Sequence, residues 1–404
     1  MRVLISGASI AGPVLAYWLT RRGFDVTVVE RAPALRKTGG HAVDLFRPAM
    51  NISEQMGVIE EIQARATGTT RMILRRSGAR HPVDVDYLKL VSVISDRHVE
   101  IMRDDLSQIY YDAGREHVEY LFGDQITAIA DDGTVEFAAS QSRRYDVVVG
   151  ADGLHSGVRQ LVFGPDAGHS RFLGGYLAVL SVPKSFAHDG EATSFLDPGR
   201  WAMVYTADHL DDARAVFLFR PDAPLDYHHR DVDRQRSLLR SVFAGMSPTV
   251  DLWLAELDGP GPFYFDSITQ LELTSWSRGR VTLVGDAGYC PGPGVGGSTS
   301  LAVLGAYVLA GELERAGGDP TAAFAAYEAV MADPVRHSRA FARTVARSLV
   351  PRSTLGVRAL VGAGWALSVL PSRLTRTIAR FNDKGVRLYD VMGYPDYPVP
   401  DRLG

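Results

Sequence analysis

The first 31 residues constrain the fold most, because they read as a complete strand, turn, helix and second strand. Residues 2–6 form a short apolar run with β-branched members, which is typical of a parallel strand buried on both faces. Gly7 ends this strand, and residues 10–22 return apolar side chains at the spacing of a helix. Residues 25–30 then predict a second strand that carries Glu30 to its end. A unit of this kind holds the pyrophosphate of a nucleotide.

The turn between this strand and helix carries a dinucleotide-binding fingerprint. The pattern G-x-G-x-x-G stands here as Gly7-Ala8-Ser9-Ile10-Ala11-Gly12, with a small serine at the middle glycine position. Glu30 lies 18 positions past Gly12, where its carboxylate can accept hydrogen bonds from the ribose hydroxyls. An ordinary α/β turn is the alternative, but the agreement of all these features favours a dinucleotide. The candidate cofactor-binding residues are Gly7, Ser9, Ile10, Ala11, Gly12, Glu30 and its neighbour Arg31.

The composition narrows the classes of protein and partner. At 404 residues and 46% hydrophobic, the chain can bury one large core or two domains. A formal net charge of −4 gives no electrostatic footprint for nucleic acid or for anionic lipid. The single cysteine cannot form an internal disulfide, no metal-ligand spacing is present, and no apolar run reaches the ~18 residues of a membrane span. Because the chain begins with a strand of the fold, no signal peptide is expected, and we predict a cytoplasmic enzyme with no nucleic acid partner and no integral membrane segment.

A glycine-rich loop over residues 36–44 follows the first unit. A Gly-Gly pair allows the backbone to approach a bound ring closely, which makes Gly40 and Asp44 candidates for contact with the cofactor. A plain surface connection is the alternative.

The next elements are expected to surround this unit. The patterns predict a helical segment over 48–64, strands over 71–96, a helix over 99–113, and short strands over 118–121, 126–130 and 135–137 that form an antiparallel crossover. Arg103 lies near the start of the helix over 99–113. Beside Asp104 and Asp105, it reads on its own as a solvated surface charge.

A second informative stretch spans residues 145–159, where a buried strand, a glycine turn and a helix start follow one another. Asp152-Gly153, Ser156 and Arg159 match the pattern D-G-x-x-S-x-x-R. This stretch resembles the motif of the class A flavin-dependent monooxygenases, the group similar to p-hydroxybenzoate hydroxylase. In that family the aspartate and the arginine stand between the FAD pyrophosphate and the path used by NAD(P)H. Arg103 also fits the R-x-x-L element of the family, whose arginine contacts the cofactor, and the resemblance therefore favours that role over a surface charge.

A third stretch, residues 280–313, predicts a buried strand, a turn and a helix rich in small residues. An aspartate at the strand end can hold a ribityl hydroxyl, and the helix N-terminus favours the charge of a reduced flavin. The stretch resembles the G-D motif of the same family, and the matching residues are Gly285, Asp286, Pro293 and Gly296. Gly297, directly after them, is a further candidate for contact with the cofactor. Two departures stand out: Tyr289 replaces the usual histidine, and residues 297–300 replace the usual glutamine-glycine-x-asparagine.

Residues 172–271 differ from the preceding segments in their sequence pattern. They contain short strand-like runs, one helical stretch at 230–243, and frequent Pro, Gly and Asp. This predicts an antiparallel sheet with helices on one side, which can wall a pocket. The aromatic and apolar candidates for that wall, each of which can equally be core, are Phe195, Trp201, Met203, Tyr205, Phe217 and Phe219. From residue 320 the pattern is helical, and the apolar stretch 355–370 is expected to pack between domains or against a second chain rather than to enter a membrane.

The fold class that follows is α/β, with a Rossmann-like FAD-binding domain similar to that of p-hydroxybenzoate hydroxylase, a β-rich substrate domain and C-terminal helices. The expected boundaries are 1–70, 97–170 and 272–340 for a discontinuous FAD domain, 71–96 and 171–271 for the substrate domain, and 341–404 for the helical extension. A monomer or a homodimer is expected.

The resemblance implies an FAD-dependent monooxygenase that uses NADPH or NADH and O2. Such an enzyme hydroxylates an aromatic or polyketide-like small molecule through a flavin C4a-hydroperoxide. Two alternatives stay open: an FAD-dependent reductase or dehydrogenase on the same fold, and a non-redox enzyme that uses FAD as a scaffold. No protein acid–base residue is assigned, because the cofactor supplies the oxidant.

Overall fold

A computed structural model describes residues 1–35, 40–95, 97–165, 168–294, 297–370 and 392–398. The N-terminal unit consists of β1 (Arg2–Ser6), α1 (Ala11–Arg21) and β2 (Asp25–Glu30). It lies in a six-stranded sheet of order β17-β18-β11-β1-β2-β7, whose other strands are β7 (Glu119–Phe122), β11 (Val147–Gly150), β17 (Ser277–Arg278) and β18 (Val281–Leu283). All neighbours are parallel except β17 and β18. The parallel α/β fold predicted from the sequence is therefore confirmed.

Four helices cover this sheet and one another. α1 packs against α5 (Arg103–Gly114) and α10 (Ser298–Arg315), and α10 packs against the long α11 (Pro320–Ser348). α10 is buried over most of its length, because small residues such as Gly305 and Gly311 let its neighbours approach closely. A short antiparallel sheet of β8 (Ile126–Ile129), β9 (Thr134–Phe137) and β10 (Arg143–Arg144) and the helix α6 (Gly157–Phe163) complete this part of the molecule.

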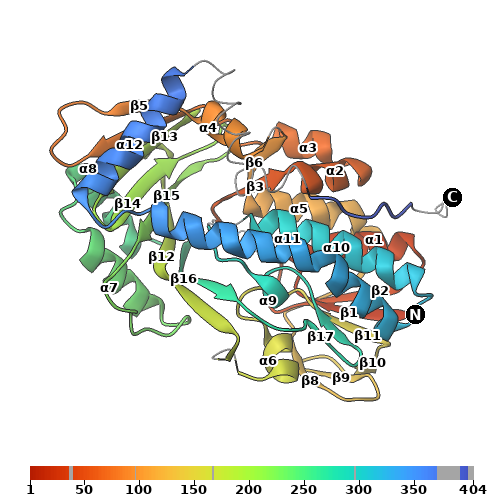
Figure 1. Ribbon diagram of the computed structural model, residues 1–404. Helices are drawn as coiled ribbons and strands as arrows, with labels where there is room; N and C mark the ends of the chain where they lie inside the picture. The colour runs from red at the N-terminus through yellow and green to blue at the C-terminus, as the bar shows by residue number, and fades with distance from the viewer. Residues whose placement is uncertain (36–39, 96, 166–167, 295–296, 371–391, 399–404) are drawn as a thin grey trace.

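A seven-stranded sheet forms the second part, on the left in Figure 1, and α11 runs across the face between the two sheets. Its order is β16-β12-β15-β14-β13-β4-β5, and only β13 and β4 are parallel. The strands are β4 (Arg71–Arg76), β5 (Val83–Asp86), β12 (Ser170–Pro183), β13 (Glu191–Asp197), β14 (Arg200–Tyr205), β15 (Asp212–Phe219) and β16 (Phe263–Leu271). The outer face is covered by α7 (Val232–Phe243) and α8 (Pro248–Ala255), and the inner face packs against the end of α11 and against α12 (Thr354–Val369).

The two faces of this sheet separate the aromatic residues proposed for the pocket wall. Side chains alternate along a strand, so every second residue reaches the inner face. Trp201, Met203 and Tyr205 belong to the inner face, whereas Phe195, Phe217 and Phe219 pack in the outer core under α7 and α8.

Two expectations about the segment after residue 70 are wrong. The run expected as strands over 71–96 ends in the helix α4 (Tyr87–Ile94), because the Asp86 carboxylate accepts a hydrogen bond from Lys89 N–H and so caps a helix. The helix expected over 99–113 starts only at Arg103, because the preceding residues form β6 (His98–Met102) against β3 (Ala42–Phe46).

Two smaller differences concern local boundaries. The helical segment at 48–64 is two helices, α2 (Arg47–Gln55) and α3 (Ile59–Ala64), separated at Gly57 with a φ of +75°. β7 lies at the edge of the parallel sheet and does not join the antiparallel crossover. The remaining elements are α9 (Asp286–Tyr289) and the single 3₁₀ turns η1 (Arg115–His117), η3 (Lys184–Phe186) and η4 (Glu256–Asp258).

α12 packs within its own chain, mainly on β5 and α4. Val357 and Val361 are buried in this contact, and Gly364 lies close to Val85. Within the described ranges, no helix is both long and apolar enough to span a bilayer.

Candidate cofactor and active site

The turn after β1 can be built only with glycine at two positions. A Cβ on Gly12 would stand 1.9 Å from the carbonyl oxygen of Gly7, and a Cβ on Gly7 would stand 2.5 Å from the carbonyl oxygen of Ala151. Gly7 also has a φ of +108°, a region that side chains other than glycine avoid. The turn therefore lies tightly against both its own helix and the strand end at Ala151.

The first turn of α1 lies next to polar groups from distant parts of the chain. Arg103 Nη2 donates to Ser9 Oγ at 3.2 Å, and Ser107 Oγ donates to the Ser9 carbonyl at 3.0 Å. Ile10 stands at the N-cap, no side chain caps the helix, and its first turn carries no acidic residue. Backbone N–H groups at such a helix start favour an anion.

Glu30 lies at the end of β2 with its carboxylate fixed. One oxygen accepts a hydrogen bond from Ala8 N–H at 3.0 Å, and the other accepts one from Ala32 N–H at 2.8 Å. The fingerprint turn and the acidic residue are thus held together directly. Arg31, the next residue, is exposed.

The D-G-x-x-S-x-x-R stretch is a helix cap linked to β1. Ser156 Oγ accepts a hydrogen bond from Arg159 N–H at 2.9 Å and caps α6, and it donates to Asp152 Oδ1 at 2.5 Å. Asp152 Oδ2 accepts bonds from Val158 N–H at 3.2 Å and from Ser6 Oγ at 3.4 Å. Burial raises the pKa of the Asp152 carboxyl, whereas the bond from Ser156 lowers it.

Arg159 joins two motifs inside the protein. Its side chain has no exposed surface, and its guanidinium donates to the carbonyl of Ala287 at 2.8 Å and to that of Leu154 at 2.5 Å. These bonds connect the stretch at 152–159 to the G-D stretch, so Arg159 positions both of them from within the core.

The G-D stretch lies against the fingerprint helix. A Cβ on Gly285 would stand 3.3 Å from Ala11 Cβ and 3.2 Å from Ala302 Cβ, which places the strand end between α1 and α10. Asp286 starts α9. Burial raises the pKa of its carboxyl, and the charge of Arg103 lowers it, so these two residues are electrostatic neighbours.

The glycine loop at Gly40 is held by both parts of the molecule. Gly40 N–H donates to Asp104 Oδ2 at 3.2 Å, and its carbonyl accepts from Arg214 Nε at 3.3 Å. Asp44 differs, because its carboxylate pairs with His98 Nε2 at 2.6 Å. The structure thus brings Gly40 to Arg103, while the side chain of Asp44 is occupied by a neighbouring strand.

Comparisons with known proteins identify the family. Residues 1–316 match the family described as the FAD binding domain. An uncharacterized protein of Mycobacterium tuberculosis is 40% identical over 81% of this chain and 88% of its own length. A flavin-dependent monooxygenase of Legionella longbeachae is 33% identical over 87% of this chain and 90% of its own length. The chain belongs to the FAD-dependent monooxygenases of class A.

A solved structure agrees with this assignment. The crystal structure of the tetracycline destructase Tet(51) matches with a TM-score of 0.82 and 30% identity, and the match covers 98% of this chain and 99% of that one. The cofactor of the family is FAD with NAD(P)H as reductant, and this chain is an FAD-dependent oxidoreductase.

Tyr289, the first departure from the family motif, belongs to the core of this monooxygenase. Its ring is 1% exposed and packs 4.8 Å from the ring of Trp276. Its hydroxyl accepts a hydrogen bond from Tyr327 at 3.1 Å, and a Cβ on Gly305 would stand 1.9 Å from it. Burial raises the pKa of Tyr289 to about 12. The side chain therefore fills space between α9, α10 and α11.

The second departure begins at the N-cap of α10. Gly297 has a left-handed φ of +60°, and its carbonyl accepts from Leu301 N–H at 3.2 Å. Ser300 Oγ receives a hydrogen bond from Phe46 N–H at 3.0 Å, which ties α10 to the end of β3. Pro293 lies in the preceding turn, and Gly296 lies outside the described residues.

One residue near the site, His41, belongs to no motif and was not predicted. His41 lies beside Arg103 and Asp44, with its ring 6.3 Å from that of Tyr264. Burial, followed by the charge of Arg103, lowers the pKa of His41 to about 4, and its ring is neutral at pH 7. The only available signal was the position of His41 directly after the glycine pair.

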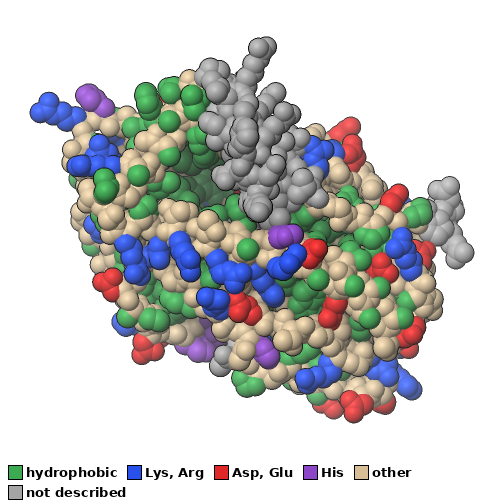
Figure 2. Space-filling view, in the orientation of Figure 1, with side chains coloured by type: hydrophobic (Ala, Val, Ile, Leu, Met, Phe, Trp, Pro, Cys, Tyr) green, Lys and Arg blue, Asp and Glu red, His purple; other side chains and the backbone are tan. Residues whose placement is uncertain are grey.

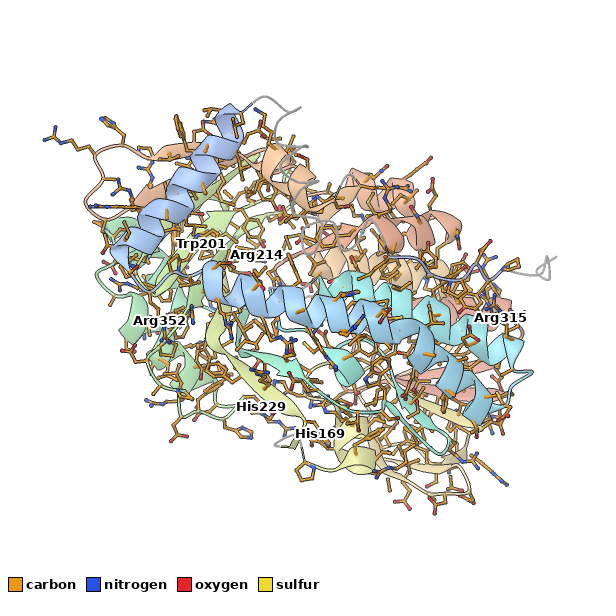
Figure 3. All side chains as sticks on the ribbon, in the orientation of Figure 1. His169, Trp201, Arg214, His229, Arg315 and Arg352 are labelled. Carbon is orange, nitrogen blue, oxygen red and sulfur yellow. The ribbon has the colours of Figure 1, made fainter. Side chains whose placement is uncertain are left out.

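The inner face of the seven-stranded sheet meets this site. Tyr205 Oη accepts a hydrogen bond from Ala42 N–H at 2.7 Å, which fixes the loop that also carries His41. Figure 2 shows an apolar hollow on the face where the two parts meet. Figure 3 shows Trp201 and Arg214 on this sheet near the C-terminal end of α11, and Trp201 and Met203 stay partly exposed beside the inner core.

Proposed function

We propose that this protein is an NAD(P)H-driven monooxygenase that inserts one oxygen atom of O2 into an aromatic or polyketide-like small molecule. The observation that carries the proposal is the convergence of the fingerprint turn, Arg103 and Asp286 beside the inner face of an apolar sheet. When bound and reduced by NAD(P)H, FAD would activate O2 and transfer one of its oxygen atoms to the substrate.

The residues of the turn after β1 fit the pyrophosphate of FAD. A Cβ at Gly7 or Gly12 would collide with the backbone, and no side chain caps the N-terminus of α1, so its N–H groups can bind an anion. Gly7, Ser9 and Gly12 would hold the pyrophosphate, and Glu30 the adenosine ribose. Asp286 would hold the ribityl chain. Asp152 and Arg159 would keep these elements in register from the core. Arg31, Gly40, Asp44, Pro293, Gly296 and Gly297 remain proposed contacts, with Gly40 the best placed of them.

The substrate would lie on the inner face of the seven-stranded sheet, against Trp201 and Met203. These side chains offer an apolar wall, which excludes water from the reacting atoms. His41, neutral at pH 7, would add a hydrogen-bonding group without a second positive charge beside Arg103. Tet(51) is named a tetracycline destructase, and tetracyclines are polyketide-like, which supports this class of substrate.

The proposed domain limits assign the FAD site and the substrate wall to different domains. We propose that 1–70, 97–170 and 272–340 form the FAD domain, 71–96 and 171–271 the substrate domain, and 341–404 the helical extension. A cytoplasmic location and a monomer or homodimer stay predictions.

Removing the carboxylate of Glu30 or of Asp286 is expected to weaken the binding of FAD without unfolding the protein. Glu30→Ala and Asp286→Ala each delete a charge-assisted hydrogen bond worth roughly 1.5–3 kcal/mol, so the Kd for FAD rises about ten- to a hundredfold. Flavin fluorescence titration of the FAD-free variants measures this change. Glu136→Ala, at an exposed position of β9, is the matched control and keeps the parent Kd. If both site variants bind FAD as tightly as the control, the assigned contacts are wrong.

Oxygen from O2 is expected in the product. With NADPH or NADH and a panel of a simple phenol, a fused-ring phenol and a tetracycline, turnover under ¹⁸O2 adds one labelled atom to the accepted substrate. Without substrate, the reduced enzyme releases hydrogen peroxide. Mass spectrometry of the product and a peroxide assay measure the two results.

The same experiment distinguishes the alternatives. A product formed at the same rate without O2 supports a reductase, and a product formed without reduced nicotinamide supports a scaffold role for FAD. Either result contradicts the proposal.

A further inference from the structure

The chain after residue 333 has an unusual balance of charge. Residues 334–370 contain no aspartate or glutamate and six arginines, which are Arg336, Arg339, Arg343, Arg347, Arg352 and Arg358. The net charge of the whole chain is −4, so the positive charge is concentrated locally. Figure 2 shows a row of Lys and Arg side chains across the middle of the face formed by α11 and α12.

Much of this charge is not neutralised by neighbours. Arg336 pairs with Asp333 at 2.8 Å, and Arg343 lies 3.6 Å from Glu272. Arg347 and Arg352 are exposed and have no carboxylate within 4.0 Å among the described residues.

A third guanidinium lies close to this pair. Burial lowers the pKa of Arg220, and the nearby charges of Arg352 and Arg347 lower it further. Arg220 Nη1 and Arg352 Nη2 donate to the backbone carbonyls of Arg347 and Pro221, so backbone bonds hold the like charges together. Such a cluster favours an external anion.

α12, which begins two residues after Arg352, exposes apolar side chains as well as Arg358. Leu355 is 75% exposed, Trp365 54% and Val369 58%. These positions, with Arg358, recur at three- to seven-residue spacing and so follow one side of the helix. Figure 3 labels Arg352 next to the turn where α11 passes into α12. A helix face with a tryptophan, aliphatic residues and arginine as its only charge is typical of a segment that lies at a lipid interface.

We propose that this surface binds reversibly to the headgroup region of an anionic lipid bilayer. The lipid face is defined as Arg336, Arg343, Arg347, Arg352, Leu355, Arg358, Trp365 and Val369. The arginines contact lipid phosphates, and the apolar side chains of α12 enter the boundary between headgroups and acyl chains. The apolar hollow of Figure 2 lies next to this face, so an apolar substrate partitioned into the bilayer would be close to the pocket.

Charge disfavours a second copy of the chain as the occupant. A two-fold contact brings the same patch of both copies together, so arginines would face arginines. A soluble anion would account for the guanidinium cluster but not for the exposed Leu355, Trp365 and Val369.

Vesicle sedimentation of the full-length, FAD-loaded protein tests the proposal. The protein is expected to pellet with vesicles that contain 30% phosphatidylglycerol, to stay in solution with pure phosphatidylcholine, and to dissociate as salt is raised. The variant Arg347→Gln/Arg352→Gln/Arg358→Gln is expected to lose about fivefold in partitioning per arginine removed, or about a hundredfold together. Trp365→Ala is expected to lower partitioning at high salt as well, because salt screens the arginines but leaves the burial of apolar side chains in the bilayer.

The matched control removes three exposed arginines elsewhere. Arg144→Gln/Arg230→Gln/Arg234→Gln changes the net charge equally and is expected to keep vesicle binding. Equal binding by the two triple variants overturns the proposal. So does an interaction of the lipid face with an oligonucleotide, inorganic phosphate or a second copy of the chain in the absence of any vesicle binding. Activity on a soluble substrate stays unchanged in the arginine variant, so this test is independent of the proposed reaction.

Discussion

Gly12→Ala is expected to abolish flavin loading and to destabilise the fold by about 3 kcal/mol. The added Cβ would stand 1.9 Å from the Gly7 oxygen and 3.1 Å from the Gly7 carbonyl carbon. Both atoms belong to the backbone, so no rotamer change relieves the contact, and the turn must open. An open turn no longer directs the helix N-terminus and Ser9 toward one anion, and FAD affinity should fall by about a hundredfold or more.

Urea unfolding of the FAD-free protein and the ratio of flavin to protein after purification measure the two effects. Gly168→Ala is the control, because a Cβ there meets no atom within 4 Å. This control should load FAD and unfold like the parent. A Gly12→Ala protein with full flavin content would show that the turn does not form the cofactor site.

Gly305→Ala is expected to destabilise the protein by about 2 kcal/mol, even though alanine is the better helix former by ~1 kcal/mol. The reason is Tyr289, whose hydroxyl oxygen would lie 1.9 Å from the new Cβ. In α12, where Gly362 faces open space, the same substitution should stabilise by up to ~1 kcal/mol. Because Gly305→Ala should lower stability and Gly362→Ala should raise it, the comparison separates the effect of the contact with Tyr289 from the effect of helix propensity.

Tyr289→Phe tests the contact from the other side. Alone, it loses the hydrogen bond from Tyr327 and should cost about 1 kcal/mol. Combined with Gly305→Ala it removes the clashing oxygen, so the double variant should be more stable than Gly305→Ala alone, with a coupling energy of about 2 kcal/mol. Chemical unfolding of the four proteins gives this value directly. Additive effects would place Tyr289 away from α10 and contradict a core role.

The N-terminal unit was predictable because its determinants are local. The apolar run of β1, the helical spacing of α1 and the glycines between them act within thirty residues, and β1, α1 and β2 form as expected. The family motifs were predictable for a related reason. Asp152, Ser156 and Arg159 keep fixed spacing because Ser156 caps α6 by accepting a hydrogen bond from the N–H of Arg159, the third residue of that helix.

Local patterns were less informative where a tertiary contact or a single side chain decided the structure. Residues 99–102 were predicted as the start of a helix, but pairing with β3 makes them part of a strand. Residues 87–94 looked like a strand, but the Asp86 cap starts a helix. In both cases a hydrogen bond outside the periodic pattern outweighed the apolar spacing.

Local sequence therefore determined the cofactor fold and the order of its motifs, since strand, turn and helix preferences and caps act over a few residues. Only the tertiary structure decided which motif residues meet and which face outward. It buried Arg159 between two stretches, gave Tyr289 a neighbour at Gly305, and set Arg103 beside both Ser9 and Asp286. It also brought Arg220, from a distant part of the sequence, beside the arginine-rich segment at Arg347 and Arg352, a neighbour that the charge pattern along the chain does not reveal.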